Sequence, residues 1–168
     1  DGRPLSGISN RKNSMAAGPI RIAQPGAILV VDAKGDTNRA VAGDFVISLM
    51  KGMDIQGLVV DGVIRDIQAI RELDFPVFSL GTTIAAGNKF GGGVIQVPIA
   101  VGGMSVQPGD FIVGDADGVV VIPQTQVHDV IQKSLNKLEK DEARAQSVSG
   151  GKDEIIAYLD QVLGNTKV

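Results

Sequence analysis

Continuous apolar runs predict three buried strands in the first half of this chain. Segment 27–32 reads AILVVD and is rich in β-branched residues, which favours a strand buried on both faces. Segment 58–61 reads LVVD and predicts a second strand, introduced by Gly57. Segment 75–81 reads FPVFSLG and predicts a third. Its Pro76 indicates a strand start or a sheet edge, because proline cannot donate a ladder hydrogen bond.

Helical spacing of apolar residues predicts short helices between these strands. The first covers about residues 44–53, with Asp44 at its N-cap, where the carboxylate can accept hydrogen bonds from free backbone N–H groups. The second lies within residues 64–73. Three apolar residues share one face of that second helix: Ile67, Ile70 and Leu73. Strands therefore alternate with helices in this half of the chain.

The second half begins with β structure and ends with helices. Residues 87–103 are punctuated by glycine and show no helical period, and residues 110–123 predict two strands joined by a turn. Residues 124–146 predict a long amphipathic helix, and residues 152–163 predict a final helix of three turns. The apolar side of the long helix carries Val127, Val130, Ile131, Leu135 and Leu138. We therefore expect an α/β fold in which the late strands cluster together.

Length and composition fit a single domain over residues 1–168, with residues 146–168 as a helical extension. The chain begins without methionine, and we expect its N-terminal part to be incomplete. It contains no cysteine, which excludes disulfides, thiolate zinc sites and thiol nucleophiles. No signal peptide is evident, and no apolar stretch approaches the ~20 residues that span a bilayer. These features predict a cytoplasmic protein without membrane contact.

Charge and aromatic content argue against nucleic acid as a direct partner. The formal net charge is −3, aromatic residues make up 4% of the chain, and tryptophan is absent. The chain therefore has few aromatic side chains on which bases could stack, and no excess of basic side chains that could bind the phosphates. Nucleotide sites also lack support, because the glycines at 91–93 and 150–151 lack the lysine and hydroxyl of a phosphate loop. No strand leads into a G-x-G-x-x-G segment.

The strongest chemical signal is Asp44, followed after twenty residues by the pair Arg65-Asp66. A buried strand that ends in a carboxylate beside a guanidinium offers a hard-cation ligand next to a fixed positive charge. This combination suits a metal-bound oxyanion. The alternative is a surface ion pair and an unrelated helix cap. Asp61 is interpreted as a structural turn residue, and His128 as a solvated residue of the long helix.

The segments around these residues resemble the 4-hydroxy-4-methyl-2-oxoglutarate aldolases and the related regulator of ribonuclease activity A, the RraA-like family. The resemblance covers about residues 25–145 and rests on segments in family order: PGAILVVD, AVAGD, GLVVDGVIRD, FPVFSLG and VQPGDFIVGDADGVVVIP. It implies an α/β fold of the three-layer swivelling β/β/α type with a mixed sheet. The Asp, twenty residues, Arg-Asp pattern of the catalytic branch matches without a gap.

The resemblance also implies a function, a divalent-metal-dependent aldolase or decarboxylase of class II. Such a lyase cleaves a 4-hydroxy or 4-carboxy 2-oxo acid and releases pyruvate. Asp66 would bind Mg²⁺ or Mn²⁺ directly, and Asp44 would hold a water of the metal shell. Backbone amides of Phe45 and Val46, at the positive end of a helix, would receive a substrate carboxylate. These two residues depart from the leucine-rich usage of the family, which affects pocket shape.

Arg65 and Asp44 are the expected catalytic residues. Cleavage between C3 and C4 leaves a pyruvate enolate, and a guanidinium on its C2 oxygen stabilises the charge that develops there. The base that removes the C4 hydroxyl proton is not identified by the sequence. The alternative function is a non-catalytic, protein-binding regulator of the ribonuclease E type, which has no need of all three residues at that spacing.

The resemblance further implies a homotrimer or a dimer of trimers, with each site at a subunit boundary. Few acidic ligands lie within the motif of one chain, which also favours this arrangement. Glu139 or Glu142 of a neighbouring subunit is the candidate that completes the site.

Overall fold

The structure is a computed structural model that describes residues 17–88 and 93–164. The chain divides into two compact units between Pro123 and Gln124. The assignment of residues 1–168 to one domain stays a prediction. Within the described ranges, no helix combines the length and the apolar character needed to cross a bilayer.

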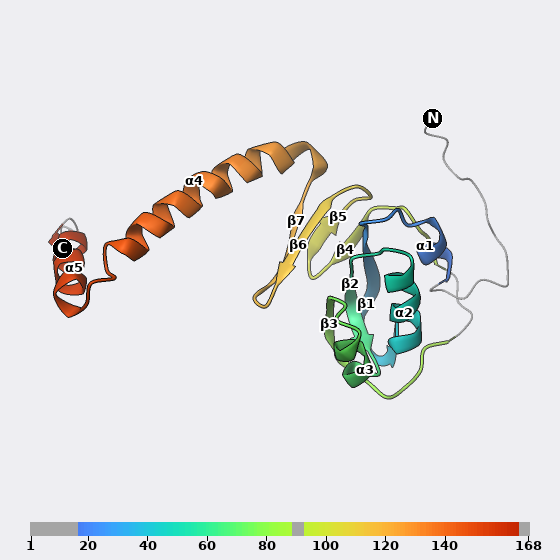
Figure 1. The fold of residues 1–168 in the computed structure, drawn as a ribbon. Helices are drawn as coiled ribbons and strands as arrows, with labels where there is room; N and C mark the ends of the chain where they lie inside the picture. Colours follow the sequence, from blue (N-terminus) through green and yellow to red (C-terminus); the bar gives the residue numbers. More distant parts are fainter. Residues whose placement is uncertain (1–16, 89–92, 165–168) are drawn as a thin grey trace. The chain divides into compact units, whose positions relative to one another are not determined.

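A parallel three-stranded sheet forms the centre of the first unit (Figure 1). It comprises β1 (Ile28–Ala40), β2 (Gly57–Ile64) and β3 (Val77–Thr82) in the order β1-β2-β3. Strand β2 lies in the middle and is buried at all but one position, which explains its continuous apolar run. Strand β3 is an edge strand that begins directly after Pro76, as predicted.

Strand β1 is longer than predicted, because a bulge interrupts it without ending it. Lys34 and Gly35 have positive φ values of 59° and 68°, and the pairing with β2 shifts between Asp32 and Asp36. The turn-forming residues that follow Asp32 therefore form a bulge within the strand and do not end it. The prediction that Asp61 is a turn residue is wrong, because it lies within β2 opposite Asp32.

Helices α1 (Ala17–Ile22), α2 (Asp44–Gly52) and α3 (Ile67–Glu72) belong to the same unit. Two sequence predictions about these helices need correction. The N-cap of α2 is Gly43 and not Asp44, which is the first helical residue. Ile67 does not share the buried face of α3 with Ile70, since its exposed fraction is 37% against 2% for Ile70.

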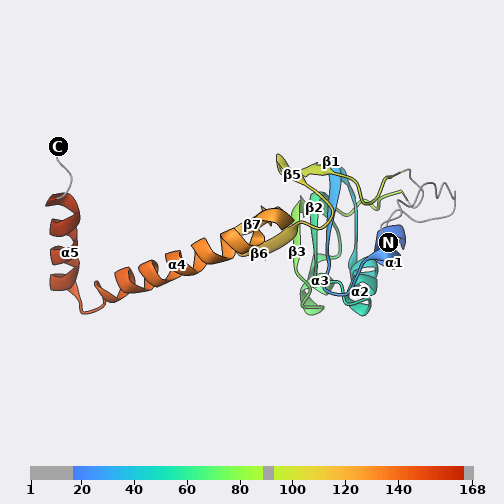
Figure 2. The same cartoon turned by 90° about the horizontal axis from the view of Figure 1, so that it is seen from above.

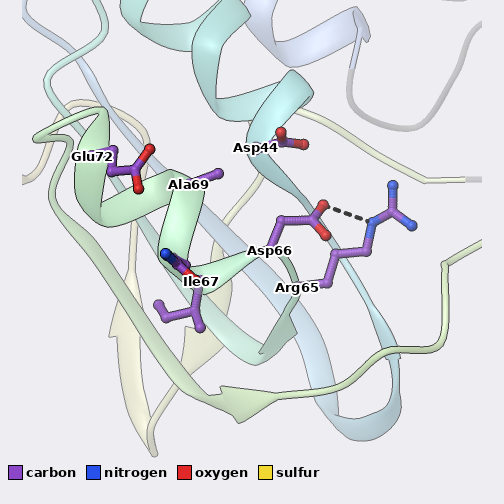
Figure 3. Close-up of a pocket in the computed structure, with 7 residues that line it drawn as sticks. Asp44, Arg65, Asp66, Ile67, Ala69 and Glu72 are labelled. Atoms are coloured by element: carbon purple, nitrogen blue, oxygen red, sulfur yellow. Dashed lines mark ion pairs between the residues drawn. The ribbon is translucent and has the colours of Figure 1, made fainter.

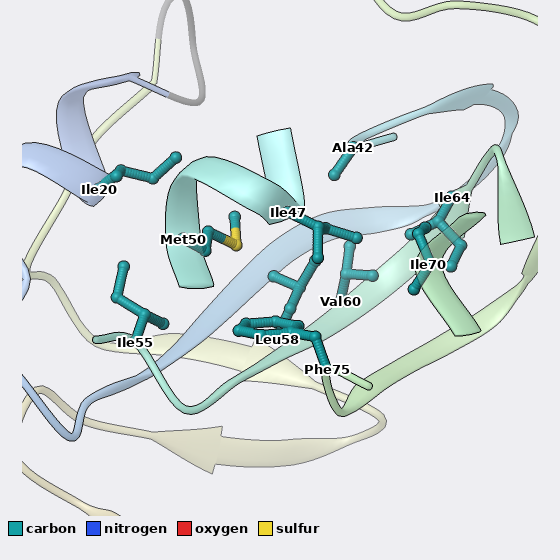
Figure 4. Packing of buried hydrophobic residues seen from close by; sticks show 10 residues of the cluster. All are labelled: Ile20, Ala42, Ile47, Met50, Ile55, Leu58, Val60, Ile64, Ile70 and Phe75. Carbon is teal, nitrogen blue, oxygen red and sulfur yellow. The ribbon is translucent and has the colours of Figure 1, made fainter. Parts of the chain in front are cut away.

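The hydrophobic core lies between these helices and one face of the sheet (Figure 4). Its buried members are Ile20, Ala42, Ile47, Met50, Ile55, Leu58, Val60, Ile64, Ile70 and Phe75. Full burial of one such aliphatic side chain contributes about 1.5–3 kcal/mol. Ile47 of α2 and Ile70 of α3 therefore hold both helices against β2, and the core fixes the first residues of α2 beside the end of β2.

Two antiparallel hairpins complete the first unit. They are β4 (Ile99–Val101) with β5 (Met104–Val106), and β6 (Phe111–Asp115) with β7 (Gly118–Ile122). Figures 1 and 2 place hairpin β6–β7 and helix α2 on opposite sides of the three-stranded sheet. The predicted three-layer α/β fold is confirmed. In the described residues, the parallel and antiparallel pairs belong to separate sheets.

The second unit consists of the short 3₁₀ helix η1 (Gln124–Gln126), α4 (Val127–Gln146) and α5 (Lys152–Gly164). The predicted long helix is confirmed, but none of the described residues of α4 is buried. Its apolar side includes Ile131, Leu135 and Leu138, which are 49%, 51% and 54% exposed. His128 is exposed, as predicted.

Candidate functional site

Backbone hydrogen bonds bring the start of α2 next to the end of β2. Val41 N–H donates to the carbonyl of Val63 at 2.8 Å, and Arg65 N–H donates to the carbonyl of Ala42 at 3.0 Å. The segment before α2 therefore runs alongside the residues that leave β2. Both segments follow the carboxyl ends of parallel strands, which is the usual place for ligand sites in α/β sheets.

An open depression of about 770 Å³ lies at this point (Figure 3). Its lining residues are Asp44, Arg65, Asp66, Ile67, Gln68, Ala69 and Glu72. The structure thus brings together the three residues that the sequence singled out. The lining contains three carboxylates, those of Asp44, Asp66 and Glu72, and one guanidinium, that of Arg65, so its formal net charge is negative and favours a cation.

Arg65 and Asp66 form an ion pair with 3.2 Å between Nε and Oδ2. The two side chains are 43% and 36% exposed, so solvent screens the pair and its contribution to folding is about 0–1 kcal/mol. Asp66 has φ 60° and ψ 36°, the left-handed region that few residues other than glycine adopt. A residue held in this region at a depression is a common feature of functional sites.

Asp44 presents its carboxylate from the first turn of α2. Its Oδ1 accepts a hydrogen bond of 2.7 Å from the backbone N–H of Phe45. That amide, expected to bind substrate, is therefore engaged in this structure, whereas no described residue accepts from Val46 N–H. The side chains of Phe45 and Val46 do not line the depression. Phe45 is 70% exposed, and Val46 packs against the core.

Helix α3 contributes residues to the lining that the sequence interpretation missed, notably Gln68 and Glu72. The two lie four residues apart and so share one face of the helix. This spacing could have identified both residues from the sequence, because a helix that begins just after Asp66 presents them on the same side. Glu72 adds an acid from the same chain. Glu139 and Glu142 belong to α4 in the second unit, and their part in a site stays a prediction.

Two carboxylate oxygens of the depression are free of hydrogen bonds from the described residues. Oδ1 of Asp66 and Oδ2 of Asp44 accept no hydrogen bond from the described residues. No group of three or more histidine, cysteine, aspartate or glutamate side chains in the described part of the chain forms a metal cage. Mg²⁺ binds through one or two carboxylates and keeps several waters, whereas zinc prefers histidine and cysteine. Asp66 and Asp44 each offer one carboxylate oxygen of the kind that such an ion binds.

Comparisons with known proteins bear on the family and the fold of this chain. The family model RraA-like, described as Aldolase/RraA, matches residues 7–121. A protein of Halalkalibacterium halodurans, named "Putative 4-hydroxy-4-methyl-2-oxoglutarate aldolase", is 53% identical over 141 residues, which are 84% of this chain and 67% of that protein.

Two solved structures are also similar. An uncharacterized protein from Pseudomonas syringae pv. tomato has a TM-score of 0.78 at 28% identity, covering 86% of this chain and 68% of that one. Streptomyces coelicolor RraAS2, described as an unusual member of the RNase ES inhibitor RraA protein family, has a TM-score of 0.72 at 32% identity. The match covers 77% of this chain and 66% of RraAS2. The chain thus spans about two thirds of the length of each protein.

Proposed function

Because this chain belongs to the RraA-like family of Aldolase/RraA proteins, we propose that it is a lyase that releases pyruvate from a 4-hydroxy or 4-carboxy 2-oxo acid. The observation that carries the proposal is the convergence of Asp44, Arg65 and Asp66 on one depression. The name of the relative from Halalkalibacterium supports the lyase class and the 4-hydroxy-4-methyl-2-oxoglutarate type of substrate.

Arg65 is the residue proposed to stabilise the transition state. In the aldol reaction the C4 hydroxyl loses its proton, the C3–C4 bond breaks, and the electron pair of that bond passes through C3 to the C2 oxygen. In the decarboxylation of a 4-carboxy substrate, the same bond breaks with loss of carbon dioxide. In both reactions C3 of the resulting enolate then takes up a proton, which gives pyruvate. The guanidinium binds the C2 oxygen more strongly as negative charge develops there, which lowers the barrier.

Asp66 is proposed to hold a divalent cation, and Asp44 to orient one of the waters around it. The bound cation would withdraw electron density from the C2 carbonyl. Because Asp66 forms an ion pair with Arg65, the residue that would hold the cation lies beside the guanidinium that would bind the C2 oxygen. The Val46 amide, at the positive end of α2, remains available for the C1 carboxylate.

A pyruvate-release assay tests this proposal. The chain is incubated with 4-hydroxy-4-methyl-2-oxoglutarate or oxaloacetate, with Mg²⁺, with Mn²⁺ or with a chelator. Samples without protein correct for spontaneous decarboxylation. We expect pyruvate release that depends on the cation. If neither substrate yields pyruvate above the protein-free rate with either cation, the lyase assignment is wrong.

The similarity to RraAS2 favours a second candidate, a protein-binding regulator of the ribonuclease E type. A binding function has no need of Asp44, Arg65 and Asp66 at their observed spacing. The variant Asp66→Asn therefore distinguishes the two candidate functions. If the protein is a lyase, the substitution should abolish pyruvate release. If the protein is a regulator, the variant should still slow RNA cleavage by a ribonuclease of this type.

A further inference from the structure

We infer that Gly43 is a positioning residue, whose missing side chain leaves the space in which the Arg65–Asp66 ion pair lies. A Cβ atom built on Gly43 would stand 2.4 Å from Oδ2 of Asp66 and 2.9 Å from Nε of Arg65. These are the two atoms that form the ion pair. The inference rests on the proposed function for its effect on turnover, whereas its geometric part stands without that function.

The backbone at Gly43 does not itself require glycine. Its φ of −134° and ψ of −175° lie in the extended region, which any residue adopts. Serine, threonine, aspartate or asparagine would give a stronger N-cap for α2 than glycine does. Glycine at this position therefore corresponds to the space required by Arg65 and Asp66, and not to a turn or a cap.

An added methyl group at position 43 would displace the ion pair and not the fold. Ile47, four residues after Gly43, is fully buried, and Ile70, four residues after Asp66, is 2% exposed, so the core holds both helices in place. The Arg65 and Asp66 side chains are 43% and 36% exposed, and they are free to turn toward solvent. A Gly43→Ala protein should therefore stay folded while its ion pair moves.

The displacement is large enough to affect catalysis. Ordinary contact begins at 3.4 Å, so Oδ2 of Asp66 must retreat by about 1 Å from a Cβ that would stand at 2.4 Å. A misplacement of about 1 Å in a reacting constellation lowers turnover on the order of 100-fold. We expect the effect in kcat and in the Mg²⁺ concentration needed for half-maximal rate, because Arg65 and the proposed cation ligand both move.

The test compares Gly43→Ala with Gly52→Ala, a matched control at the last residue of α2, where an added Cβ meets nothing within 4 Å. We expect kcat for pyruvate release to fall about 100-fold in Gly43→Ala and to stay at the parent value in Gly52→Ala. The midpoint of thermal unfolding should fall in Gly43→Ala by no more than the few degrees that alanine costs at an N-cap, and it should not fall in Gly52→Ala. A Gly43→Ala protein that keeps its turnover, or that unfolds, contradicts the inference.

Two further measurements separate positioning from a structural role and from failure of the proposed function. In an Arg65→Lys background, Gly43→Ala should lower kcat by a much smaller factor than it does in the parent. An equal fold-decrease in kcat in both backgrounds would count against an action of Gly43 through the Arg65–Asp66 ion pair. The Arg65 Nε–Hε signal in ¹H–¹⁵N spectra should shift in Gly43→Ala only. If the parent releases no pyruvate, the lyase proposal fails, and the inference about Gly43 is then tested by the Arg65 Nε–Hε signal alone. The same chemical shift of this signal in the parent and in Gly43→Ala would overturn the inference.

Discussion

At the scale of the single residue, the backbone of Asp66 explains how two consecutive residues reach the same depression. Successive side chains of an extended strand point to opposite faces, so Arg65 and Asp66 would diverge if β2 simply continued. The left-handed conformation of Asp66 changes the direction of the chain before α3 and lets both side chains line the depression. The sequence predicted the pair, but not this conformation, because aspartate occurs in several backbone regions and no neighbouring glycine marks the turn.

The first prediction concerns the charge of Asp66. Asp66→Asn should abolish cation-dependent pyruvate release and leave stability nearly unchanged, because asparagine tolerates the left-handed backbone as aspartate does. Asp66→Ala should abolish release as well and lose about 1–2 kcal/mol of stability for the strained backbone. Steady-state assays and denaturant unfolding measure the two effects.

Asp54→Asn is the matched control for this change. Asp54 is exposed and has a φ of 57°, so the same substitution occurs in the same backbone region but away from the depression. We expect it to keep full activity. If Asp66→Asn also keeps most of its turnover at saturating Mg²⁺, Asp66 is not the cation ligand.

The second prediction concerns the shape of the Arg65 side chain. Arg65→Lys keeps the charge and removes the planar fork that can hold an oxygen in fixed geometry. If Arg65 stabilises the enolate oxygen, kcat should fall on the order of 100-fold or more, while KM changes less. Arg71→Lys, at an exposed position of α3 outside the lining, serves as the control. A kcat within threefold of the parent would return Arg65 to the role of a surface ion pair.

At the scale of the element, the sequence predicted where strands and helices occur better than where they end. The apolar runs identified β1, β2 and β3, because burial on both faces leaves a continuous apolar signal. The extension of β1 to Ala40 depends on pairing with β2 across a bulge. The local sequence does not predict this pairing, because the partner residues lie far away along the chain. The predicted N-cap of α2 was wrong by one residue, because aspartate is favourable both at the N-cap and in the first helical turn.

The β1 bulge leads to the third prediction. The Lys34 ammonium group donates to the Asp32 carboxylate, and so does the Lys34 backbone N–H, at 2.9 Å. These two hydrogen bonds, the ammonium one first, hold the pKa of the Asp32 carboxyl below its usual value of 3.8. Stability from this interaction is present above that value and is lost as pH falls through the lower folded-state pKa. Lys34→Ala should raise the Asp32 pKa toward 3.8.

Carboxyl ¹³C titration by NMR measures this shift. Lys133→Ala, which removes an exposed partner of Asp129 on α4, is the control and should leave the Asp32 titration unchanged. If the Asp32 midpoint is the same with and without the Lys34 side chain, the ammonium group does not stabilise the bulge.

At the scale of the whole molecule, the described structure leaves apolar side chains without cover. Besides the apolar side of α4, hairpin β6–β7 exposes Phe111, Val113 and Val120 at 51%, 57% and 59%. Contiguous exposed apolar surface is characteristic of interaction sites. The sequence predicted the amphipathic helix, but its pattern cannot distinguish a face that packs within the chain from a face that packs on another chain.

The fourth prediction is therefore the homotrimer or dimer of trimers expected from the family resemblance. Size-exclusion chromatography with light scattering at micromolar concentration should give a mass of three or six chains of 17.5 kDa. If the purified chain has the mass of a monomer across this range, the assembly is not a property of the chain. The depression described above would then have to act without a neighbouring subunit.

The left-handed backbone of Asp66 also bears on how a lineage with this fold can change. Aspartate and asparagine both tolerate that backbone, and a single base change converts one codon into the other. A descendant chain with asparagine at this position would keep its core, its strand order and its outer surface while losing the negative charge of the site. Shape could then be inherited after the chemistry is gone, and selection on the surface alone would be sufficient to maintain the protein.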